Sequence, residues 1–397
     1  MIASALGQRS RPTASPRSAR LASISVILGI LILVIVLLLP ACTRQPQPAR
    51  VEEITFQSGE FTLVGELRTP AGTEPFPVVL FVHGDAEGAN RTMFGMYLPI
   101  MERMLQAGYA VFSWDNPGAG ESTGTTERYR ITQQQAQIVL DAIEVMKAYP
   151  DIDPGRIGLW GVSMAGYVMP RVLMVSDDVA FMICQSCGSM SGNDEFVYLT
   201  VAQGYCGGVP EEDAGQLKTL LAELDEARTF DTYDGYLRYR EVLDELAALG
   251  SVTVPHPVAS ESGWLANDPA YEFAWSPVHV FEQVRIPVLA IWGERDTKID
   301  PIRAAHAYRD ALEQAGNSNY RVEVIPGADH NLVPSETGCN SEEGQMLERV
   351  LAEQGFTWED LETLDPQDPV LLTLASAWPY APGYLDLIEE WLTGLQP

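Results

Sequence analysis

Short runs with the character of β-strands alternate with longer segments of helical periodicity through most of this 397-residue chain. The clearest run, Val78 to His83 (VVLFVH), is almost continuously apolar, which is typical of a strand buried on both faces of a sheet. Strands and helices that alternate in this way predict an α/β fold, in which a mostly parallel sheet carries helices on both faces. Because ligands bind at the carboxyl ends of the strands in such folds, the chemistry is expected there.

The remaining elements follow from the same patterns. Further strands are predicted at Ile54 to Ser58 and Phe61 to Arg68, which form a hairpin around Gly59, and at Ala110 to Trp114, Arg156 to Trp160, Val179 to Cys184, Val288 to Trp292 and Tyr320 to Ile325. Helices are predicted at Tyr97 to Gln106, Thr132 to Ala148, from Met164 onward, Ile302 to Gln314 and Tyr384 to Leu395.

Residues 1–43 have the order of a secretory leader. A basic segment precedes an apolar run, Leu21 to Leu39, that ends in the string LPAC. The string resembles a lipobox, which would make Cys42 the lipid-modified first residue of the mature chain, although Pro40 departs from the usual residue. The run also approaches the roughly 20 residues that span a bilayer, so an uncleaved signal anchor and a cleaved, free protein remain alternatives. All three alternatives export the body of the chain. The lipoprotein, which we prefer, and the signal anchor would hold it at the cell envelope through a short tether at 44–50.

The charge balance excludes one class of partner. The chain carries 25 Lys and Arg against 54 Asp and Glu, a net charge of -29 that repels phosphate backbones and argues against nucleic-acid binding. Removal of the leader, with its four arginines, leaves 21 against 54, a net charge of -33. A hydrophobic fraction of 46% with 20% charged residues is ordinary for a globular protein with a large core.

Four cysteines follow the leader: Cys184, Cys187, Cys206 and Cys339. An even number in an oxidising compartment predicts two disulfides, for which three connectivities exist. Cys184 and Cys187 form a CxxC pair, but no second pair and no neighbouring histidine accompanies it, so a metal site is not expected. We expect Cys206 to pair with Cys339 or with Cys187.

A candidate nucleophile lies in the string GVSMAG, at the end of the predicted strand Arg156 to Trp160. A serine on a strand-to-helix turn adopts a strained backbone, and its neighbours two positions away must be small for strand and helix to pack around it. Gly161 and Ala165 meet that requirement around Ser163, and Gly166 supplies the next close contact. Ala165 stands where the usual motif has glycine.

A serine hydroxyl needs a base, and His330 is the best placed of the five histidines because it follows the last predicted core strand. A carboxylate should orient that histidine, and Asp296 follows the strand Val288 to Trp292. Asp300 is the runner-up acid, and Glu294 lies too close to the strand. The chain order is then Ser163, Asp296, His330.

An oxyanion needs backbone N–H donors. We expect these donors to be Met164, directly after the nucleophile, and Asp85, in the loop HGDAEG after an early strand. His83 in the same loop is expected to be structural, since the triad needs no second base.

These strings together resemble a known family. VVLFVHG, WDNPGAGES, DPGRIGLWGVSMAG, VRIPVLAIWGERD and GADH occur in the order of a serine hydrolase of the α/β-hydrolase superfamily, most similar to the serine aminopeptidase-like and dipeptidyl-peptidase-like group, which includes esterases and thioesterases. The resemblance covers about Val51 to Val333 and the last helix, apart from an insertion. Pro117 departs from the arginine that many relatives carry there.

The resemblance implies an α/β-hydrolase fold with a helical cap. The expected organisation is a first core part at 51–187, a cap at 188–277, and a second core part at 278–397 that contains a helical insertion at about 334–381. We expect a disulfide to anchor this late lobe, with Cys206 as the candidate partner of its Cys339. The aromatic cap residues would build either the cap's own core or an apolar substrate pocket: Tyr198, Tyr205, Phe230, Tyr233, Tyr236, Tyr239, Trp264, Tyr271, Phe273 and Trp275.

The expected function is an extracytoplasmic, membrane-anchored serine hydrolase that cleaves carboxylic esters through an acyl-Ser163 intermediate. A peptidase, aminopeptidase or thioesterase with the same triad is one alternative, and a binding module without turnover is another. An aminopeptidase needs a carboxylate for the substrate's ammonium group; the candidates are Asp194, Glu195 and Glu261. No metal or organic cofactor is expected, because the serine supplies the nucleophile.

Overall fold

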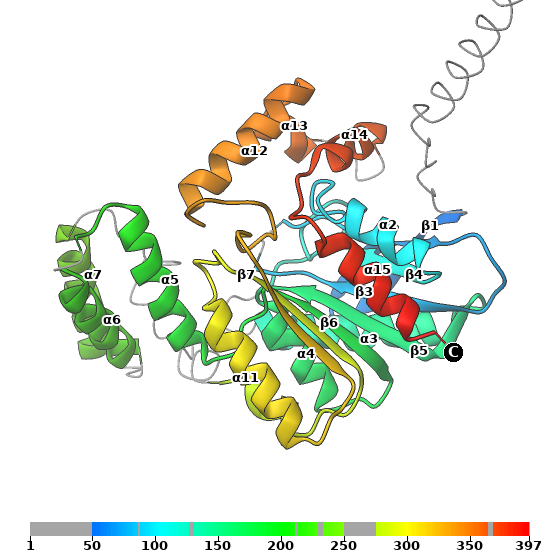
Figure 1. Cartoon of the computed structure of the whole chain (residues 1–397), viewed down its shortest axis with the longest axis horizontal. Helices are drawn as coiled ribbons and strands as arrows, with labels where there is room; N and C mark the ends of the chain where they lie inside the picture. Colours follow the sequence, from blue (N-terminus) through cyan, green and yellow to red (C-terminus); the bar gives the residue numbers. More distant parts are fainter. Residues whose placement is uncertain are drawn as a thin grey trace, which may run out of the picture. The chain divides into compact units, whose positions relative to one another are not determined.

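The computed structural model describes residues 50–85, 88–126, 131–210, 213–228, 233–249, 275–363 and 368–396 (Figure 1). The expected leader, its Cys42, and the tether up to residue 49 lie outside the described residues. The tether was predicted one residue too long, because Arg50 already begins the first strand and pairs with Thr69. No helix in the described ranges is long and apolar enough to cross a membrane.

One sheet forms the centre of the described chain. Its strands are β1 (Arg50–Ser58), β2 (Phe61–Thr69), β3 (Phe76–Val82), β4 (Ala110–Trp114), β5 (Ile152–Val162), β6 (Val179–Gln185), β7 (Val288–Gly293) and β8 (Tyr320–Ile325). The spatial order is β1, β2, β4, β3, β5, β6, β7, β8. Strand β2 runs antiparallel to β1 and β4, and the other neighbours are parallel, which confirms the predicted mostly parallel α/β sheet.

Strand β5 begins earlier than its sequence predicted. Ile152 already pairs with Phe76, whereas the predicted start was Arg156. The pairing shifts register before it resumes between Val78 and Ile157, and the irregular segment contains an exposed Pro-Gly dipeptide. Such a dipeptide usually ends a strand in a sequence-based prediction, so the pairing before it was missed.

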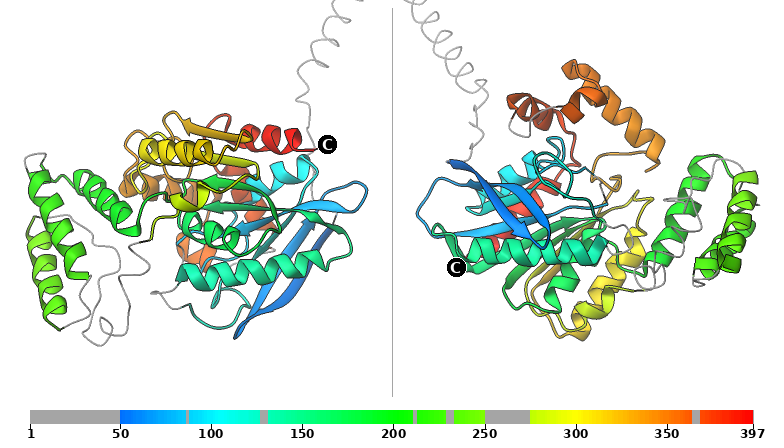
Figure 2. Two further views of the ribbon diagram at one scale, coloured as in Figure 1. Left: turned by 90° about the horizontal axis from the view of Figure 1, so that it is seen from below. Right: turned by 180° about the vertical axis from the view of Figure 1, so that it is seen from behind.

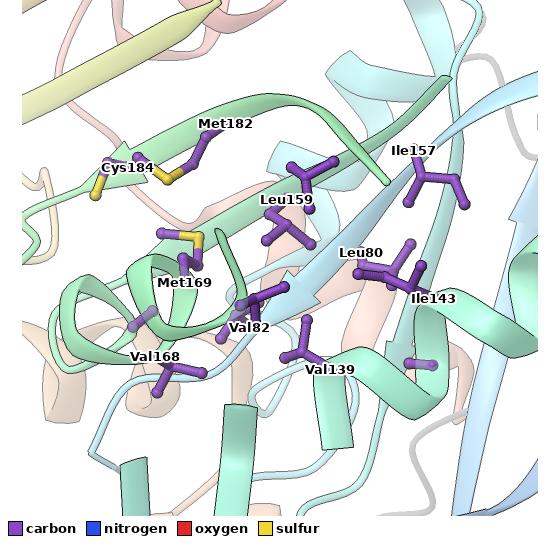
Figure 3. Close-up of a cluster of buried hydrophobic side chains, with 14 of the residues drawn as sticks. Leu80, Val82, Val139, Ile143, Ile157, Leu159, Val168, Met169, Met182 and Cys184 are labelled. Atoms are coloured by element: carbon purple, nitrogen blue, oxygen red, sulfur yellow. The ribbon is translucent and has the colours of Figure 1, made fainter. Parts of the chain in front are cut away.

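Helices cover both faces of the sheet, as Figure 2 shows. They are α2 (Leu98–Gln106), α3 (Ile131–Lys147), α4 (Ala165–Leu173), α10 (Val278–Phe281), α11 (Pro301–Gln314) and α15 (Tyr384–Gly394). Alternate residues of the fully buried β3 enter two different cores. Leu80 and Val82 pack with α3 and α4 (Figure 3), whereas Phe81 packs with α2 and α15 on the other face.

A helical insertion follows β6. It contains α5 (Gly192–Cys206), α6 (Ala214–Arg228) and α7 (Tyr233–Ala248), and residues 250–274 lie outside the described part. Helices α6 and α7 pack against each other around a small core that includes Leu217, Leu221 and Tyr239.

A second insertion follows the loop after β8. It contains α12 (Asn340–Gln354), α13 (Trp358–Thr363) and α14 (Pro369–Ala377). Leu351, Leu361 and Leu371 join the same hydrophobic core as α2 and α15. Helix α14 was not predicted, although Asp368 caps its first turn just before a proline, which is a recognisable helix start.

Two disulfides pair the four described cysteines. Cys206 bonds Cys339, which is one of the two expected pairings, and Cys184 bonds Cys187. The alternative pairing of Cys206 with Cys187 is therefore wrong.

Candidate active site

Ser163 occupies the sharp turn between β5 and α4. Its φ angle is +57°, a left-handed conformation that costs a non-glycine residue free energy and has to be held by its surroundings. The Ser163 N–H donates to the Gln185 carbonyl at 3.0 Å, and the Ser163 carbonyl accepts from the N–H groups of Gly166 at 2.9 Å and Gly188 at 3.1 Å. The ends of β5 and β6 thus hold the serine's backbone on both sides.

The small residues around this turn are required by contact. A Cβ atom at Gly161 would lie 2.5 Å from the Cβ of Ala165, so this alanine fits because its partner is a glycine. A Cβ atom at Gly166 would lie 2.6 Å from the Gly188 carbonyl oxygen, where there is no room for it. The predicted small residues are therefore the ones that let helix α4 approach the strand ends.

His330 and Asp296 lie in direct contact. The His330 Nδ1 is 2.8 Å from the Asp296 Oδ2, and both side chains are almost fully buried. The other carboxylate oxygen, Oδ1, accepts from the backbone N–H groups of Lys298 at 2.8 Å and Ile299 at 2.9 Å. The carboxylate is therefore fixed in a position that orients the imidazole.

The two alternative acids have other roles. Asp300 is the N-cap of α11 and accepts from the N–H groups of Ile302 and Arg303. Glu294 accepts from the Gly327 N–H at 2.9 Å. The geometry therefore favours Asp296 as the acid.

The end of β6 connects the serine to the histidine loop. Gln185 accepts the Ser163 N–H, and the next residue, Ser186, donates through its hydroxyl to the His330 carbonyl at 2.7 Å. The Arg295 N–H also donates to the Ala328 carbonyl at 2.7 Å, so the acid and histidine loops are bonded to each other. The predicted trio is thus brought to one edge of the sheet, at the ends of β5, β7 and β8.

The expected oxyanion donors flank the serine. Met164 is the N-cap of α4, and the first N–H groups of a helix have no acceptor within the helix. A Cβ atom at Gly84 would lie 3.4 Å from the Ser163 Cβ, so the loop that carries Asp85 runs directly against the nucleophile turn. Asp85 itself is exposed, and Ala86 and Glu87 lie outside the described residues.

The other described histidines do not join this site. His83 is buried, its Nε2 lies 2.7 Å from the Trp114 carbonyl, and burial lowers its pKa, as suits a neutral structural side chain. His279 and His306 are exposed on α10 and α11.

A buried ion pair that the sequence does not predict supports the segment that follows β3. Asp115 accepts from the Arg91 N–H at 2.7 Å and from its guanidinium at 2.8 Å, and both side chains are buried. The Asn116 N–H also donates to the Ala89 carbonyl. Asp115 lies in the string WDNPGAGES, which is part of the family resemblance. Its partner, Arg91, lies 24 residues earlier, and no sequence pattern around Arg91 predicts the pairing.

Two of the three candidate carboxylates for an aminopeptidase's ammonium site already accept hydrogen bonds within the protein. Glu195 is buried, and one of its oxygens accepts from the N–H groups of Ser189 at 3.0 Å and Met190 at 3.1 Å. Burial raises its pKa despite these bonds. Asp194 accepts from Ser191, and Glu261 lies outside the described residues.

The cap aromatics have several roles. Tyr239 and Tyr236 contribute to the core of α6 and α7, whereas Tyr205 and Tyr233 are exposed. Trp275 packs over the guanidinium of Arg171, and Phe230, Trp264, Tyr271 and Phe273 lie outside the described residues. Among the side chains that the structure describes, no group of three or more His, Cys, Asp or Glu is placed to hold a metal ion.

Comparison with known proteins identifies several similarities. The model of the alpha/beta hydrolase family matches residues 79–338. The thiohydrolase aneE of Aspergillus aculeatus is 30% identical over 120 residues, which are 29% of this chain and 36% of that protein. An uncharacterized protein of Escherichia coli is 31% identical over 100 residues, 25% of this chain and 33% of its own length. The chain thus matches about a third of the length of these curated relatives.

Solved structures are similar at low identity. An esterase of Pyrococcus furiosus is 19% identical, with a TM-score of 0.44, over 71% of this chain and 83% of its own. An acylaminoacyl peptidase of Pyrococcus horikoshii is also 19% identical, with a TM-score of 0.42, over 72% of this chain and 39% of its own.

Proposed function

Because this chain belongs to the alpha/beta hydrolase family, we propose that it is a serine hydrolase that cleaves carboxylic esters through an acyl-Ser163 intermediate. The observation that carries the proposal is the 2.8 Å contact between His330 Nδ1 and a buried Asp296, in a chain that also holds Ser163 at a φ of +57° at the end of β5. A histidine oriented in this way is the group that a serine hydroxyl needs as its base.

The reaction would run in two halves. The Ser163 Oγ attacks the ester carbonyl while the Nε2 of His330 takes the proton of the Ser163 hydroxyl. The Asp296 carboxylate stabilises the imidazolium that forms. The N–H groups of Met164 and Asp85 stabilise the oxyanion. The imidazolium then protonates the departing alcohol, which leaves the acyl-serine. In the second half His330 activates a water molecule that releases the acid.

We prefer ester substrates over aminoacyl substrates because the two described candidates for binding an ammonium group, Glu195 and Asp194, already accept hydrogen bonds within the protein. Glu195 binds the backbone of Ser189 and Met190, and Asp194 binds Ser191. Similarity to a protein named a thiohydrolase favours thioesters as the second candidate.

Location is part of the proposal. The leader order of residues 1–43 supports export, and two disulfides among the described cysteines fit an oxidising compartment. We propose that Cys42 is lipidated and tethers the hydrolase to the cell envelope, with a signal anchor as the alternative. Metabolic labelling with a radioactive fatty acid should mark the wild type and fail to mark Cys42→Ser.

The test of activity is labelling with a fluorophosphonate probe, which reacts with activated serines. The wild type should be labelled and Ser163→Ala should not. Absence of labelling in the wild type would favour a binding module without turnover, and labelling that survives Ser163→Ala would show that another residue reacts with the probe. A panel of short-chain esters, thioesters and aminoacyl amides then separates the substrate classes, and turnover of amides alone would contradict the ester preference.

A further inference from the structure

The loop that carries Asp296 is held by the first insertion. We call residues 295–298 the acid loop. From α5, the Tyr198 hydroxyl donates to the Asp296 carbonyl at 2.8 Å, and the Gln203 Nε2 donates to the Thr297 Oγ1 at 2.7 Å. One helix of the cap thus bonds the catalytic acid's own peptide unit and the residue after it.

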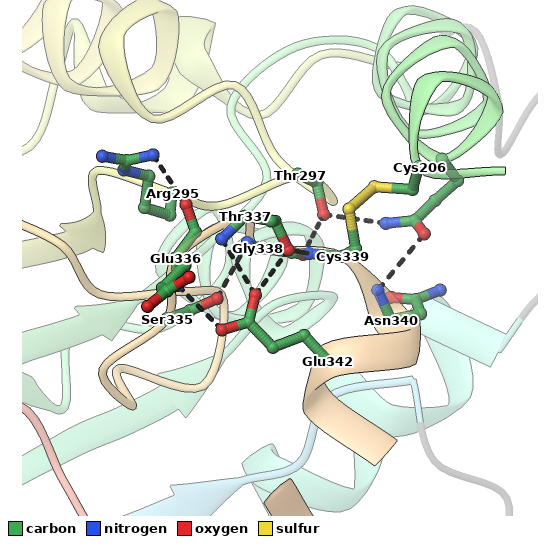
Figure 4. The surroundings of a disulfide bond; sticks show 11 residues. Cys206, Arg295, Thr297, Ser335, Glu336, Thr337, Gly338, Cys339, Asn340 and Glu342 are labelled. Atoms are coloured by element: carbon green, nitrogen blue, oxygen red, sulfur yellow. Dashed lines mark hydrogen bonds between the residues drawn. A yellow bond between two sulfur atoms is a disulfide. The ribbon is translucent and has the colours of Figure 1, made fainter. Parts of the chain in front are cut away.

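The second insertion holds the same loop from another side (Figure 4). Three acid-loop side chains donate to its first residues: Arg295 to the Glu336 carbonyl at 2.7 Å, Thr297 to the Gly338 carbonyl at 2.5 Å and Lys298 to the Glu343 carboxylate at 2.8 Å. The approach is close, since a Cβ atom at Gly338 would lie 1.7 Å from the Arg295 carbonyl oxygen. Each of the four acid-loop residues therefore has a hydrogen bond to an insertion.

The two insertions are also joined to each other beside this loop. The Cys206–Cys339 disulfide links the last residue of α5 to the N-cap of α12, and the Asn340 N–H donates to Gln203 at 3.3 Å. Gln203 therefore contacts both the acid loop and the second insertion. The disulfide therefore joins the two insertions directly to each other, and each insertion also bonds residues 295–298.

We propose that Tyr198 and Gln203 are positioning residues for Asp296, and that the Cys206–Cys339 disulfide keeps them in place, so that catalysis depends on a bond between the two insertions. This inference rests on the proposed serine hydrolase function. Tyr198, Gln203 and the disulfide are together called the clamp. Without the clamp, Ser163 keeps its turn and the Asp296 carboxylate keeps its bonds to the Lys298 and Ile299 N–H groups, but the loop that carries Asp296 is held less firmly relative to His330.

The expected consequence is a loss of turnover rather than of folding. A misplacement of about 1 Å in a catalytic group lowers the rate by up to about 100-fold. A displaced carboxylate also stabilises the imidazolium less, so the acid limb of the pH–rate profile should move to lower pH. The charged groups around the pair include Asp329 beside His330, Glu195 on α5, Glu343 with Lys298, and the nearby Asp300, Arg295 and Arg303. The substitutions below leave all of them unchanged.

The first experiment compares Tyr198→Phe with Tyr205→Phe, an exposed tyrosine on the same helix. Tyr198→Phe removes only the hydroxyl that reaches Asp296. We expect its fluorophosphonate labelling and short-chain ester turnover to fall roughly 10-fold, with KM little changed and the acid limb shifted down. Tyr205→Phe should match the wild type, and thermal unfolding should show that both variants fold.

The second experiment replaces both cysteines, in the Cys206→Ser, Cys339→Ser variant. Ester turnover by this double variant should be as slow as turnover by Tyr198→Phe. A water-soluble reductant should slow turnover by the wild type and leave turnover by the double variant unchanged. The Cys184–Cys187 disulfide is fully buried, whereas Cys206 and Cys339 are both partly exposed to reductant. A wild type without Ser163-dependent labelling would overturn the proposed function. If the wild type shows Ser163-dependent labelling and both clamp variants have the same rate and pH profile as the wild type, the clamp proposal is overturned and the proposed function stands.

Discussion

The proposed nucleophile, Ser163, and the proposed acid, Asp296, are held in place by different sets of contacts. Ser163 is fixed by the ends of β5 and β6 and by small residues within a few positions of it. The Asp296 carboxylate is held by N–H groups of its own loop, and that loop also bonds Tyr198, 98 residues before Asp296, and a segment about 41 residues after Arg295 and Thr297. The serine turn is therefore held within the core, whereas the loop that carries the acid has additional contacts with two insertions.

The two sides also differ in charge. The serine turn is built from glycine, alanine, methionine and a disulfide, which do not titrate there. The acid side buries several carboxylates, among them Glu195 and Asp329, whose pKa values are raised by burial. We therefore expect packing changes to damage the nucleophile side and changes of charge or pH to affect the acid side.

The largest expected effect comes from the acid itself. Asp296→Asn leaves the shape of the side chain but favours the wrong histidine tautomer, and in comparable triads this lowers turnover by about 10⁴-fold. Asp300→Asn is the matched control, because asparagine caps a helix about as well as aspartate. Ester turnover and probe labelling should fall in the first variant and stay near the wild-type rate in the second. A comparable loss of turnover in Asp300→Asn would contradict the assignment of Asp296, rather than Asp300, as the acid.

The next effect tests the packing of the nucleophile side. Gly166→Ala in α4 and Gly344→Ala in α12 are the same change in two helices, and helix propensity favours alanine in both by about 1 kcal/mol. At position 166 the new Cβ would lie 2.6 Å from a backbone oxygen, whereas at position 344 nothing lies within 4 Å. Urea unfolding should show that Gly166→Ala loses about 2 kcal/mol and that Gly344→Ala gains up to about 1 kcal/mol. A gain at both positions would contradict the close contact.

The same comparison explains what the sequence could predict. The strand ends, the small residues around Ser163 and the order of the triad depend on local patterns, so they were predictable from the motif. Tyr198, Gln203 and Arg91 act through partners between 24 and 98 residues away, and no periodicity connects such residues. The disulfide pairing had two expected solutions, because cysteine counts limit connectivity without choosing it.

A third prediction concerns the acid side at different pH values. Burial raises the pKa of Asp329 to about 6, and the charge of Glu343 contributes to this rise. Between about pH 4 and pH 6 the folded state then binds more protons than the unfolded state, so the free energy of unfolding falls as the pH rises through this window. The Asp329→Asn variant has no carboxyl group to titrate at this position, so its free energy of unfolding should not fall through this window for this reason. Its side-chain oxygen can still accept from the N–H groups of Asn331 and Val333.

Urea unfolding at several pH values measures the effect. The stability of Asp329→Asn relative to the wild type should increase by about 2 kcal/mol between pH 4 and pH 7. A difference that stays constant with pH would show that the carboxyl group does not titrate in this window.

The smallest expected effect concerns the strain at Ser163. A left-handed backbone costs a non-glycine residue about 1–2 kcal/mol, and glycine avoids this cost but loses roughly 0.4–1 kcal/mol through the greater freedom of its unfolded chain. Ser163→Gly should therefore be more stable than Ser163→Ala by about 0.5–1 kcal/mol, although neither keeps the nucleophile. At the exposed helical residue Gln137 the order should reverse, with alanine more stable than glycine by about 1 kcal/mol. The same order at both positions would show that the core does not force the serine into its turn. The predicted reversal would mean that the strand ends and the small residues around Ser163 hold this residue in a backbone conformation that alanine does not favour.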